Sequence, residues 1–283
     1  MKKLPFVKMH GTGNDFIVLY EKDIEELEVN LSEAFIQKMC NRNFGIGSDG
    51  LLVVAESKKA DFRYDMYNPD GSRAEMCGNG IRCYMKYLLE NKLTEKKQID
   101  VETLAGILQV AFEDNLFTVN MGAPGKIKDI AFKNKKLGDR FFLKSEGRDF
   151  LFTPVSMGNP HAVIFLQNES LDKFNVEKYG MPIERNIDIF PQRTNVEFVD
   201  VISSKEISMR VWERGAGETL SCGTGACASV VAGILAGFLD KDEFVKVNIR
   251  GGTLYVKWSG DEKDTVIMQG AAEITFEGFY YVR

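Results

Sequence analysis

Hydrophobic and polar residues alternate along several short stretches of the chain, and this alternation predicts β-strands. The stretches are rich in β-branched and aromatic residues and are separated by turn-forming residues. Strands are predicted in the first half at 16–20, 50–56, 61–68 and 117–122, and in the second half at 162–166, 194–201, 207–214, 244–250 and 253–258. A last strand, at 273–283, is expected to return to the first half and complete an early sheet.

Three segments have the pattern of helices. Residues 31–43 form a predicted helix with Ser32 as its N-cap, and residues 81–92 and 226–239 form two more. The segment 226–239 is apolar around almost its whole circumference and rich in Ala and Gly. Because a helix without a polar face must be buried on all sides, we expect a strongly curved sheet wrapped around each of the last two helices.

A repeat with an offset of 145 residues relates the two halves. The stretch GTGNDFIVL at 11–19 resembles SMGNPHAVIF at 156–165, and 222 − 77 = 145 separates two Cys-Gly-x-Gly motifs. The landmarks that keep this offset are Cys77 and Cys222, Asn14 and Asn159, and Asn68 and Glu213. The sequence therefore predicts an α+β fold of two similar, pseudo-symmetric domains, residues 1–121 with 270–283 and residues 122–269. Each domain is expected to be a curved mixed or antiparallel sheet around a central helix, with the active site in a cleft between the domains.

Composition narrows the class of protein. The 283 residues suffice for a large core, and the net charge of −5 offers no basic surface for nucleic acid. No apolar run approaches a membrane span, and MKKLPFVKMHGTG lacks the apolar core of a signal peptide. Five cysteines, an odd number, argue against a disulfide scaffold. We expect a cytoplasmic protein without membrane or nucleic-acid partners.

Each repeated cysteine directly precedes a predicted helix. The glycines that follow, Gly78 and Gly80 or Gly223 and Gly225, allow a ligand to approach the backbone closely. A helix N-terminus presents unpaired N–H groups that bind carboxylate, and its field lowers the pKa of a thiol. We therefore expect thiolate to be accessible near neutral pH at both cysteines.

Cysteines in a chain of this kind have other common roles. A free cysteine is commonly a buried, inert core residue, and this is our interpretation of Cys40, Cys83 and Cys227. Zinc and redox sites favour Cys-x-x-Cys, whereas the spacings here are six and five residues and the chain has two histidines. We expect no metal, and the absence of a pyridoxal lysine motif or nucleotide fingerprint predicts no cofactor.

Two activated thiols on opposite sides of a carbon atom suggest a two-base reaction. The thiolate removes a proton from one face, and the thiol returns a proton to the other face, which inverts a stereocentre. The N–H groups of the two helix ends would stabilise the negative charge that develops on a substrate carboxylate as the α-proton leaves.

The stretches KMHGTGNDF, NPDGSRAEMCGNGIRC, SMGNPH, TNVEFV and WERGAGETLSCGTGACA together closely resemble the diaminopimelate epimerase family over essentially the whole chain. The resemblance implies pyridoxal-independent interconversion of LL- and meso-diaminopimelate, for lysine and peptidoglycan synthesis. It also implies two similar domains, each a curved sheet around a central helix, and a homodimer.

The resemblance also assigns site residues. Cys77 and Cys222 would be the acid–base pair, and His161 and Glu213 would tune their pKa values, with Glu213 also binding the amine. The reacting carboxylate and amine would be held by Gly78, Asn79, Gly223 and Thr224. The distal end of the substrate would be read by Asn14, Asn68, Asn159, Asn195 and Arg214, the last through its bidentate guanidinium.

Several of these residues have plainer interpretations. Asn14 and Asn68 both lie in turn-forming sequences, and His161 is as consistent with a structural role as with a functional one. His10 is more readily structural. Some relatives carry Gln where this chain has Gly50, so that Ser48 or a water would supply the missing hydrogen bond.

Two other functions stay open at this point. A related cysteine-pair racemase for another amino acid, such as a lanthionine-like diamino diacid, proline or histidine, would keep the two cysteines but need not keep Arg214 and the asparagines. A non-catalytic binding or redox protein could hold a small ligand in the same cleft, but it would have no need of two thiols at helix starts.

Overall fold

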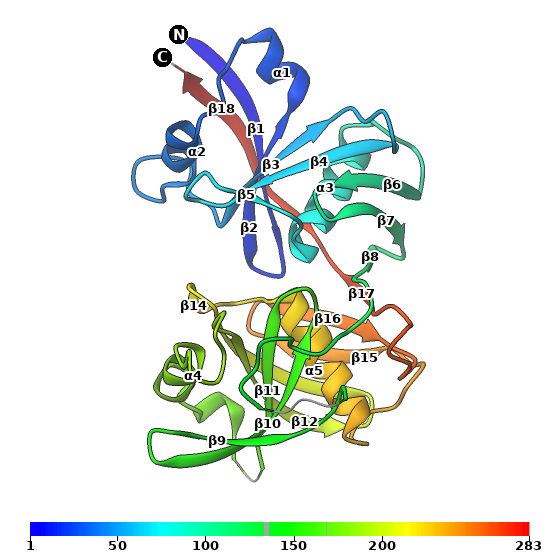
Figure 1. The fold of residues 1–283 in the computed structure, drawn as a ribbon. Helices are drawn as coiled ribbons and strands as arrows, with labels where there is room; N and C mark the ends of the chain where they lie inside the picture. Colours follow the sequence, from blue (N-terminus) through cyan, green and yellow to red (C-terminus); the bar gives the residue numbers. More distant parts are fainter. Residues whose placement is uncertain (133–135, 168, 283) are drawn as a thin grey trace. The chain divides into compact units, whose positions relative to one another are not determined.

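The computed structural model describes residues 1–132, 136–167 and 169–282, and it divides into two compact units. The first unit contains Met1–Val119 and the residues from Gly270 onward, and the second contains Asn120–Gln269 (Figure 1). The predicted last strand extends to Val282, and Arg283 lies outside the described residues.

The first unit is a mixed sheet with three helices. Its elements are β1 (Lys2–Gly11), β2 (Asn14–Tyr20), α1 (Glu21–Glu26), α2 (Glu33–Cys40), β3 (Gly50–Ala55), β4 (Phe62–Tyr67), β5 (Arg73–Ala74), α3 (Gly78–Glu90), β6 (Gln98–Thr103), β7 (Gly106–Glu113), β8 (Leu116–Asn120), which leads out of the unit, and β18 (Glu273–Val282). Strand β18 pairs antiparallel with β1, as expected of the returning strand. From there the sheet runs through β2, β3, β4 and β6 to β7, with parallel pairing of β2 with β3 and of β4 with β6.

The second unit repeats this plan. Its elements are β9 (Phe141–Ser145), β10 (Arg148–Ser156), β11 (Pro160–Phe165), the 3-10 helix η1 (Leu171–Lys173), α4 (Val176–Glu184), β12 (Asn195–Ser203), β13 (Glu206–Glu213), β14 (Gly217–Glu218), α5 (Gly223–Leu235), β15 (Val245–Ile249), β16 (Gly252–Lys257) and β17 (Ile267–Gly270), which leads back to the first unit. Strands β11 and β12 pair in parallel, as do β13 and β15.

The offset of 145 residues is visible in the structure. Helices α3 and α5 begin 223 − 78 = 145 residues apart and end 235 − 90 = 145 residues apart. The parallel pairs share one register, because Phe16 lies opposite Gly50 in the first unit and His161 lies opposite Asn195 in the second. The predicted α+β class with two pseudo-symmetric halves is therefore confirmed.

Each unit is built around one buried helix. Helix α3 contacts β1, β2, β3, β7 and β18, and α5 contacts β10, β11, β12, β13 and β16, so each sheet curves around its helix (Figure 1). In α5, Gly223 and residues 225–233 are buried, as the lack of a polar face predicts. The predicted extension of this helix to residue 239 was wrong, because Gly237 adopts φ +75° and ends the helix.

The prediction for the helix that follows Leu31 was nearly right. Ser32 is its N-cap and accepts a hydrogen bond from the Phe35 amide at 3.3 Å, although the helix spans only Glu33–Cys40. The three cysteines interpreted as core residues, Cys40, Cys83 and Cys227, are all buried.

A charged cluster holds the start of β2 in place. Arg42 donates to both carboxylate oxygens of Asp15, at 2.7 and 3.1 Å, and Lys8 forms an ion pair with the same carboxylate. Burial alone would raise the pKa of Asp15, but the hydrogen bonds from Arg42 and Lys8 outweigh it and lower that pKa to about 2.

Replacing Asp15 by Asn should therefore destabilise the fold in a pH-dependent way. A carboxylate with a lowered pKa stabilises the protein above its ordinary value of 3.8, and this contribution is lost as the pH falls toward 2. We expect Asp15→Asn to lower the free energy of unfolding by up to about 2 kcal/mol at neutral pH, an upper value because the exposed Arg42 is screened by solvent. Urea unfolding at neutral pH and below pH 3.8 measures the difference.

The matched control is Asp149→Asn, whose carboxylate makes one exposed contact with Lys144 at 3.8 Å and should change little. An Asp15→Asn variant equally destabilised at neutral and at acid pH would show that the ion pairs are not the source of its loss.

Candidate active site

Cys77 is the N-cap of α3, and its thiol faces an asparagine of the neighbouring turn. The Cys77 Sγ lies 3.6 Å from the Asn14 Oδ1, which also accepts a hydrogen bond from the Asn79 side chain at 3.2 Å. The Asn14 amide is oriented by Asp49, whose carboxylate accepts from its Nδ2 at 2.8 Å. The turn before Asn14 needs φ +51° at Thr12 and +86° at Gly13, which places the asparagine beside the helix end. Cys77, Asn14 and Asn79 thus form one polar group in the first unit.

Cys222 is the N-cap of α5 and is linked to the corresponding residues of the second unit. Its sulfur accepts from the Gly225 amide at 3.3 Å and lies 3.5 Å from the Thr224 Oγ1. The Asn159 Nδ2 donates to this hydroxyl at 3.3 Å. Asn79 and Asn14 are 65 residues apart, and so are Thr224 and Asn159, so the repeat places the same kind of hydrogen bond beside each cysteine.

Glycine is required in the first turn of each helix. A Cβ on Gly80 would lie 2.5 Å from the Tyr64 hydroxyl, and one on Gly225 would lie 2.8 Å from the Glu197 Oε1. The second glycine of each Cys-Gly-x-Gly motif therefore admits a polar side chain of the sheet beneath the helix end. It was expected to admit a ligand.

A fully buried acid–imidazole pair lies beneath the start of α5. The His161 Nδ1 is 2.6 Å from the Glu197 Oε1, and neither side chain is exposed. The His161 Nε2 lies 2.9 Å from the Asn159 Oδ1. His161 is therefore joined to the polar group around Cys222 through Asn159.

The electrostatics at Cys222 correct one expectation. Burial raises the pKa of the Cys222 thiol well above its ordinary value, and the carboxylates of Glu213 and Glu197 raise it further. Hydrogen bonds from Thr224 and the Gly225 amide lower this pKa, but they do not outweigh burial. The expectation of an accessible thiolate at both helix ends is therefore wrong for Cys222, which holds its proton at neutral pH.

Glu213 lies at the end of β13, close enough to Cys222 to accept a hydrogen bond from its thiol. Burial raises the pKa of Glu213, while hydrogen bonds from Thr219 and Cys222 act to lower it. The Thr219 hydroxyl fixes one carboxylate oxygen. Glu213 thus lies beside the thiol, where its charge affects the protonation of Cys222.

The remaining predicted residues lie around these groups. Asn195, at the start of β12, donates from its side chain to the Pro160 carbonyl at 3.0 Å and accepts from the Arg214 amide at 2.9 Å. The exposed Arg214 donates from its guanidinium to the Gln192 carbonyl at 3.1 Å. Asn68 lies in the turn after β4 and donates to the Ser72 hydroxyl at 3.0 Å, so the structure shows it in the turn role.

The glycines next to the cysteines, Gly78 and Gly223, are the first residues of α3 and α5 and are buried. His10 accepts from the Gly13 amide at 3.4 Å and has the structural role expected of it. Ser48 does not fill the place of the missing Gln side chain, because its buried hydroxyl donates to the Cys40 sulfur at 3.3 Å. A Cβ at Gly50 would lie 3.0 Å from the Tyr67 carbonyl oxygen, so this corner is already tight.

Known proteins match the chain along nearly all of its length. The sequence model of the family described as diaminopimelate epimerase matches residues 6–127 and 153–275. The chain belongs to the diaminopimelate epimerase family. The diaminopimelate epimerase of Carboxydothermus hydrogenoformans is 48% identical to it over 282 residues, which cover 99% of this chain and 100% of that protein.

Solved structures with the same fold are more distant in sequence. The PhzF-family phenazine biosynthesis protein of Bacillus anthracis has a TM-score of 0.70 at 18% identity and covers 100% of both chains. A hydroxyproline epimerase from Agrobacterium vitis has a TM-score of 0.69 at 15% identity, covering 98% of this chain and 92% of that one. These likenesses establish the fold.

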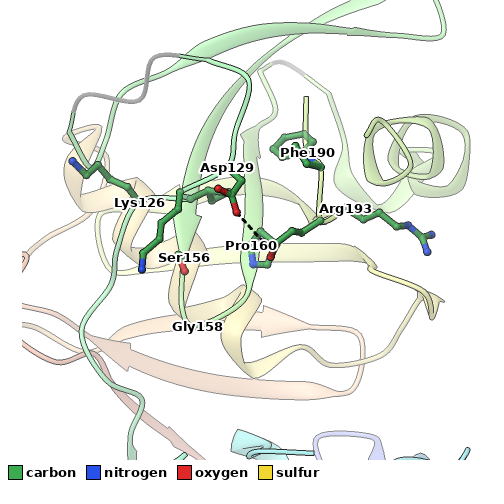
Figure 2. A pocket seen from close by; sticks show the side chains of 11 residues that line it. Lys126, Asp129, Ser156, Gly158, Pro160, Phe190 and Arg193 are labelled. Carbon is green, nitrogen blue, oxygen red and sulfur yellow. Dashed lines mark hydrogen bonds between the residues drawn. The ribbon is translucent and has the colours of Figure 1, made fainter. Parts of the chain in front are cut away.

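A pocket of about 330 Å³ lies beside the turn that joins β10 to β11 (Figure 2). Its lining consists of Ser156, Gly158 and Pro160 with residues 126–129 and 190–193. The predicted site residues of the diaminopimelate epimerase resemblance are not among its lining residues, as far as the structure describes them. The pocket is lined by both sequence neighbours of Asn159 but not by Cys77 or Cys222.

The described residues contain no group of three His, Cys, Asp or Glu side chains placed to hold a metal ion. No helix in this part of the chain has the length and apolar character needed to cross a membrane.

Two residues that were not predicted from the sequence lie at the site. Asp49 orients the Asn14 amide, and Glu197 pairs with His161. Glu197 lies within the TNVEFV motif that carries the family resemblance, but its partner is 36 residues away. The 145-residue offset offers one signal for Glu197: the corresponding position in the first half is the apolar Leu52, so a carboxylate at this place in a strand is unusual for the repeat.

The two cysteines should differ in their reaction with iodoacetamide. Cys222 is 5% exposed and its pKa is raised, whereas Cys77 is partly exposed. We expect alkylation of Cys77 to be faster at neutral pH, and alkylation of Cys222 to increase only as the pH rises toward the raised pKa, because the thiolate is the nucleophile. Peptide mass spectrometry over a pH series measures both rates.

Cys77→Ser is the control, since it removes interference from the faster site. Alkylation of Cys222 at neutral pH as rapid as that of Cys77 would contradict the assignment of a protonated Cys222.

Proposed function

We propose that this chain interconverts LL- and meso-diaminopimelate by transferring a proton between its α-carbon and the thiols of Cys77 and Cys222. The observation that carries the proposal is the repeat of one arrangement. In each unit a cysteine, Cys77 or Cys222, caps a buried helix. The residue two positions after it accepts or donates a hydrogen bond with an asparagine 63 residues before the cysteine, as Asn79 does with Asn14 and Thr224 with Asn159. Membership in the diaminopimelate epimerase family names the substrate.

The proposed reaction uses the two thiols as its acid and its base. In one direction the thiolate forms an S–H bond as the Cα–H bond breaks, and the thiol on the opposite face gives up its proton to form the new Cα–H bond. The thiol and thiolate exchange roles, and the configuration at one carbon is inverted. Because Cys222 holds its proton, we assign it as the thiol that donates in the resting enzyme, with Cys77 as the base.

Other site residues would bind the substrate. The backbone and side chains at the helix starts, Gly78, Asn79, Gly223 and Thr224, are suited to the reacting carboxylate, because a helix N-terminus presents free N–H groups. Glu213 is suited to the α-ammonium through its charge. For the distal end we propose Arg214 and the asparagines at 14, 68, 159 and 195, with Arg214 binding the carboxylate.

The two-thiol reaction requires both cysteines at one substrate. We propose that each unit contributes one cysteine to a shared site in a cleft between residues 1–121 with 270–283 and residues 122–269. The family resemblance also supports a homodimer, and the odd number of cysteines supports a cytoplasmic location, without nucleic-acid or membrane partners.

The first test is proton NMR of LL-diaminopimelate with the reduced protein in deuterated water. We expect the α-proton signal to disappear while the meso isomer forms, since proton removal and return take place on opposite faces. Cys77→Ser and Cys222→Ser should each abolish inversion, and Cys40→Ser, at a buried core cysteine, serves as the matched control. Folded, reduced protein that causes neither exchange nor inversion would end the proposal.

A second test addresses the choice of substrate, because the fold is shared with a hydroxyproline epimerase. Arg214→Ala should lower kcat/KM for diaminopimelate by about 10- to 100-fold, the value of a hydrogen-bonded charge pair to the distal carboxylate. The control is Arg185→Ala, which removes another exposed arginine of the same unit. Unchanged kcat/KM in Arg214→Ala would instead favour a substrate without a distal carboxylate.

A further inference from the structure

Glu197 is a buried carboxylate that the proposed reaction does not use. It lies in β12 and is fully buried, as is His161 in the neighbouring β11. Its Oε1 lies 2.6 Å from the His161 Nδ1, and its Oε2 has no hydrogen-bond partner among the described residues. Burying an ionisable group with one oxygen unsatisfied is costly, so its presence calls for a reason.

A continuous series of polar contacts runs from Glu197 to the thiol of Cys222. From the His161 Nε2 it continues to the Asn159 Oδ1 at 2.9 Å, and from the Asn159 Nδ2 to the Thr224 Oγ1 at 3.3 Å. The Thr224 hydroxyl then lies 3.5 Å from the Cys222 sulfur. Each member fixes the orientation of the next, because an amide or imidazole with one end bound presents a defined atom at the other.

The first unit shows that the fold itself does not need this pair. The residues that correspond to His161 and Glu197 are Phe16 and Leu52, and both are fully buried in the same parallel register. Beneath α3, apolar side chains therefore occupy the positions that His161 and Glu197 occupy in the second unit, beside the Tyr64 hydroxyl. Since a well-packed apolar pair is commonly as stable as a buried ionisable pair, stability does not explain why the second unit carries His and Glu.

The geometry points to Glu197 as a positioning residue for the reaction at Cys222, an inference that rests on the proposed function. Both ring nitrogens of His161 face oxygen acceptors, so both carry a proton in this arrangement: the Nδ1–H donates to Glu197 and the Nε2–H donates to the Asn159 Oδ1. Glu197 thereby fixes the plane of the ring. Nε2 is then directed at Asn159, which holds Thr224 against the sulfur. Glu197 thus holds the donor thiol in place through His161, Asn159 and Thr224, without touching the substrate itself.

Two substitutions separate this role from a packing role. Glu197→Leu introduces the residue that the first unit carries at this place, and Glu197→Gln keeps an oxygen that accepts from Nδ1. We expect Glu197→Leu to lower kcat by about 100-fold with little change in KM, within the range for a misplaced proton-transfer group. Glu197→Gln should recover at least about tenfold of that loss. Ser145→Ala, which removes a buried hydrogen bond to the Tyr179 carbonyl elsewhere in the unit, is the control and should stay close to the unsubstituted protein.

Nitrogen-15 NMR of the imidazoles gives a readout that packing alone would not move. The chain has two histidines, so a His10→Gln variant assigns the spectrum. We expect protons on both ring nitrogens of His161 in the unsubstituted protein, and loss of the Nδ1 proton in Glu197→Leu while Nε2 keeps its own. This measurement needs no substrate.

The outcomes are distinct. If the unsubstituted protein does not act on diaminopimelate, the proposed function and this inference both fail. If it does act, but Glu197→Leu folds and keeps kcat within about threefold, Glu197 has no positioning role. A kcat loss in Glu197→Leu without loss of the His161 Nδ1 proton also overturns the inference. If Glu197→Leu fails to fold, two other results overturn the inference. One is an unprotonated His161 Nδ1 in the unsubstituted protein. The other is a Glu197→Gln variant whose kcat is as low as that of His161→Ala.

Discussion

The arrangement of the site depends on how closely the first turn of each buried helix approaches the sheet around it. In the second unit the turn comes so near to β12 that a Cβ at Gly225 would meet the Glu197 carboxylate at 2.8 Å and the Cys222 sulfur at 3.1 Å. Glycine is therefore the residue that lets the cysteine, the helix start and the buried carboxylate occupy one small volume. The sulfur takes the role of an N-cap side chain and accepts from the Gly225 amide.

The two units place different side chains beneath the first turn of the buried helix. Beneath α3 the turn meets the Tyr64 hydroxyl, and the pair behind it is Phe16 and Leu52. Beneath α5 the corresponding pair is His161 and Glu197. The two units thus share one backbone register, and the second has a buried ionisable pair where the first has an apolar pair. A reaction that needs one proton donor and one acceptor has a use for such inequivalence, since two thiols in identical surroundings would have no preference for either role.

Local pattern and the repeat were enough to predict much of this fold. The two central helices, their capping cysteines and the return of β18 to β1 followed from apolar periodicity, Cys-Gly-x-Gly and the 145-residue offset. Strand β1 was not predicted, because Pro5 and three lysines obscure its alternation. The structure tolerates Pro5 since β1 pairs there only with β18, while β2 begins its pairing at Val7.

The contacts of the site could be predicted less well than its landmarks. Helix 176–184 contains Gly180 and Pro182, which weaken any helical pattern, and it was not predicted either. Glu197 looks like one member of an apolar strand until the parallel pairing of β11 with β12 brings it to His161. The pKa of Cys222 is raised rather than lowered as expected, because burial and the carboxylates of Glu213 and Glu197 act on it. The sequence around the helix start does not show these effects.

The sizes of these effects explain why a helix end alone does not make Cys222 a thiolate. The field of a helix terminus contributes typically about 0.3–1 kcal/mol to a nearby charge, whereas full burial can shift a pKa by several units in the opposite direction. Glu213 and Glu197 add to the burial effect. A bound α-ammonium would bring a positive charge to this side of the proposed site and offset both carboxylates. In the proposed reaction, the substrate therefore supplies the charge that lets Cys222 give up its proton, and proton transfer is tied to binding.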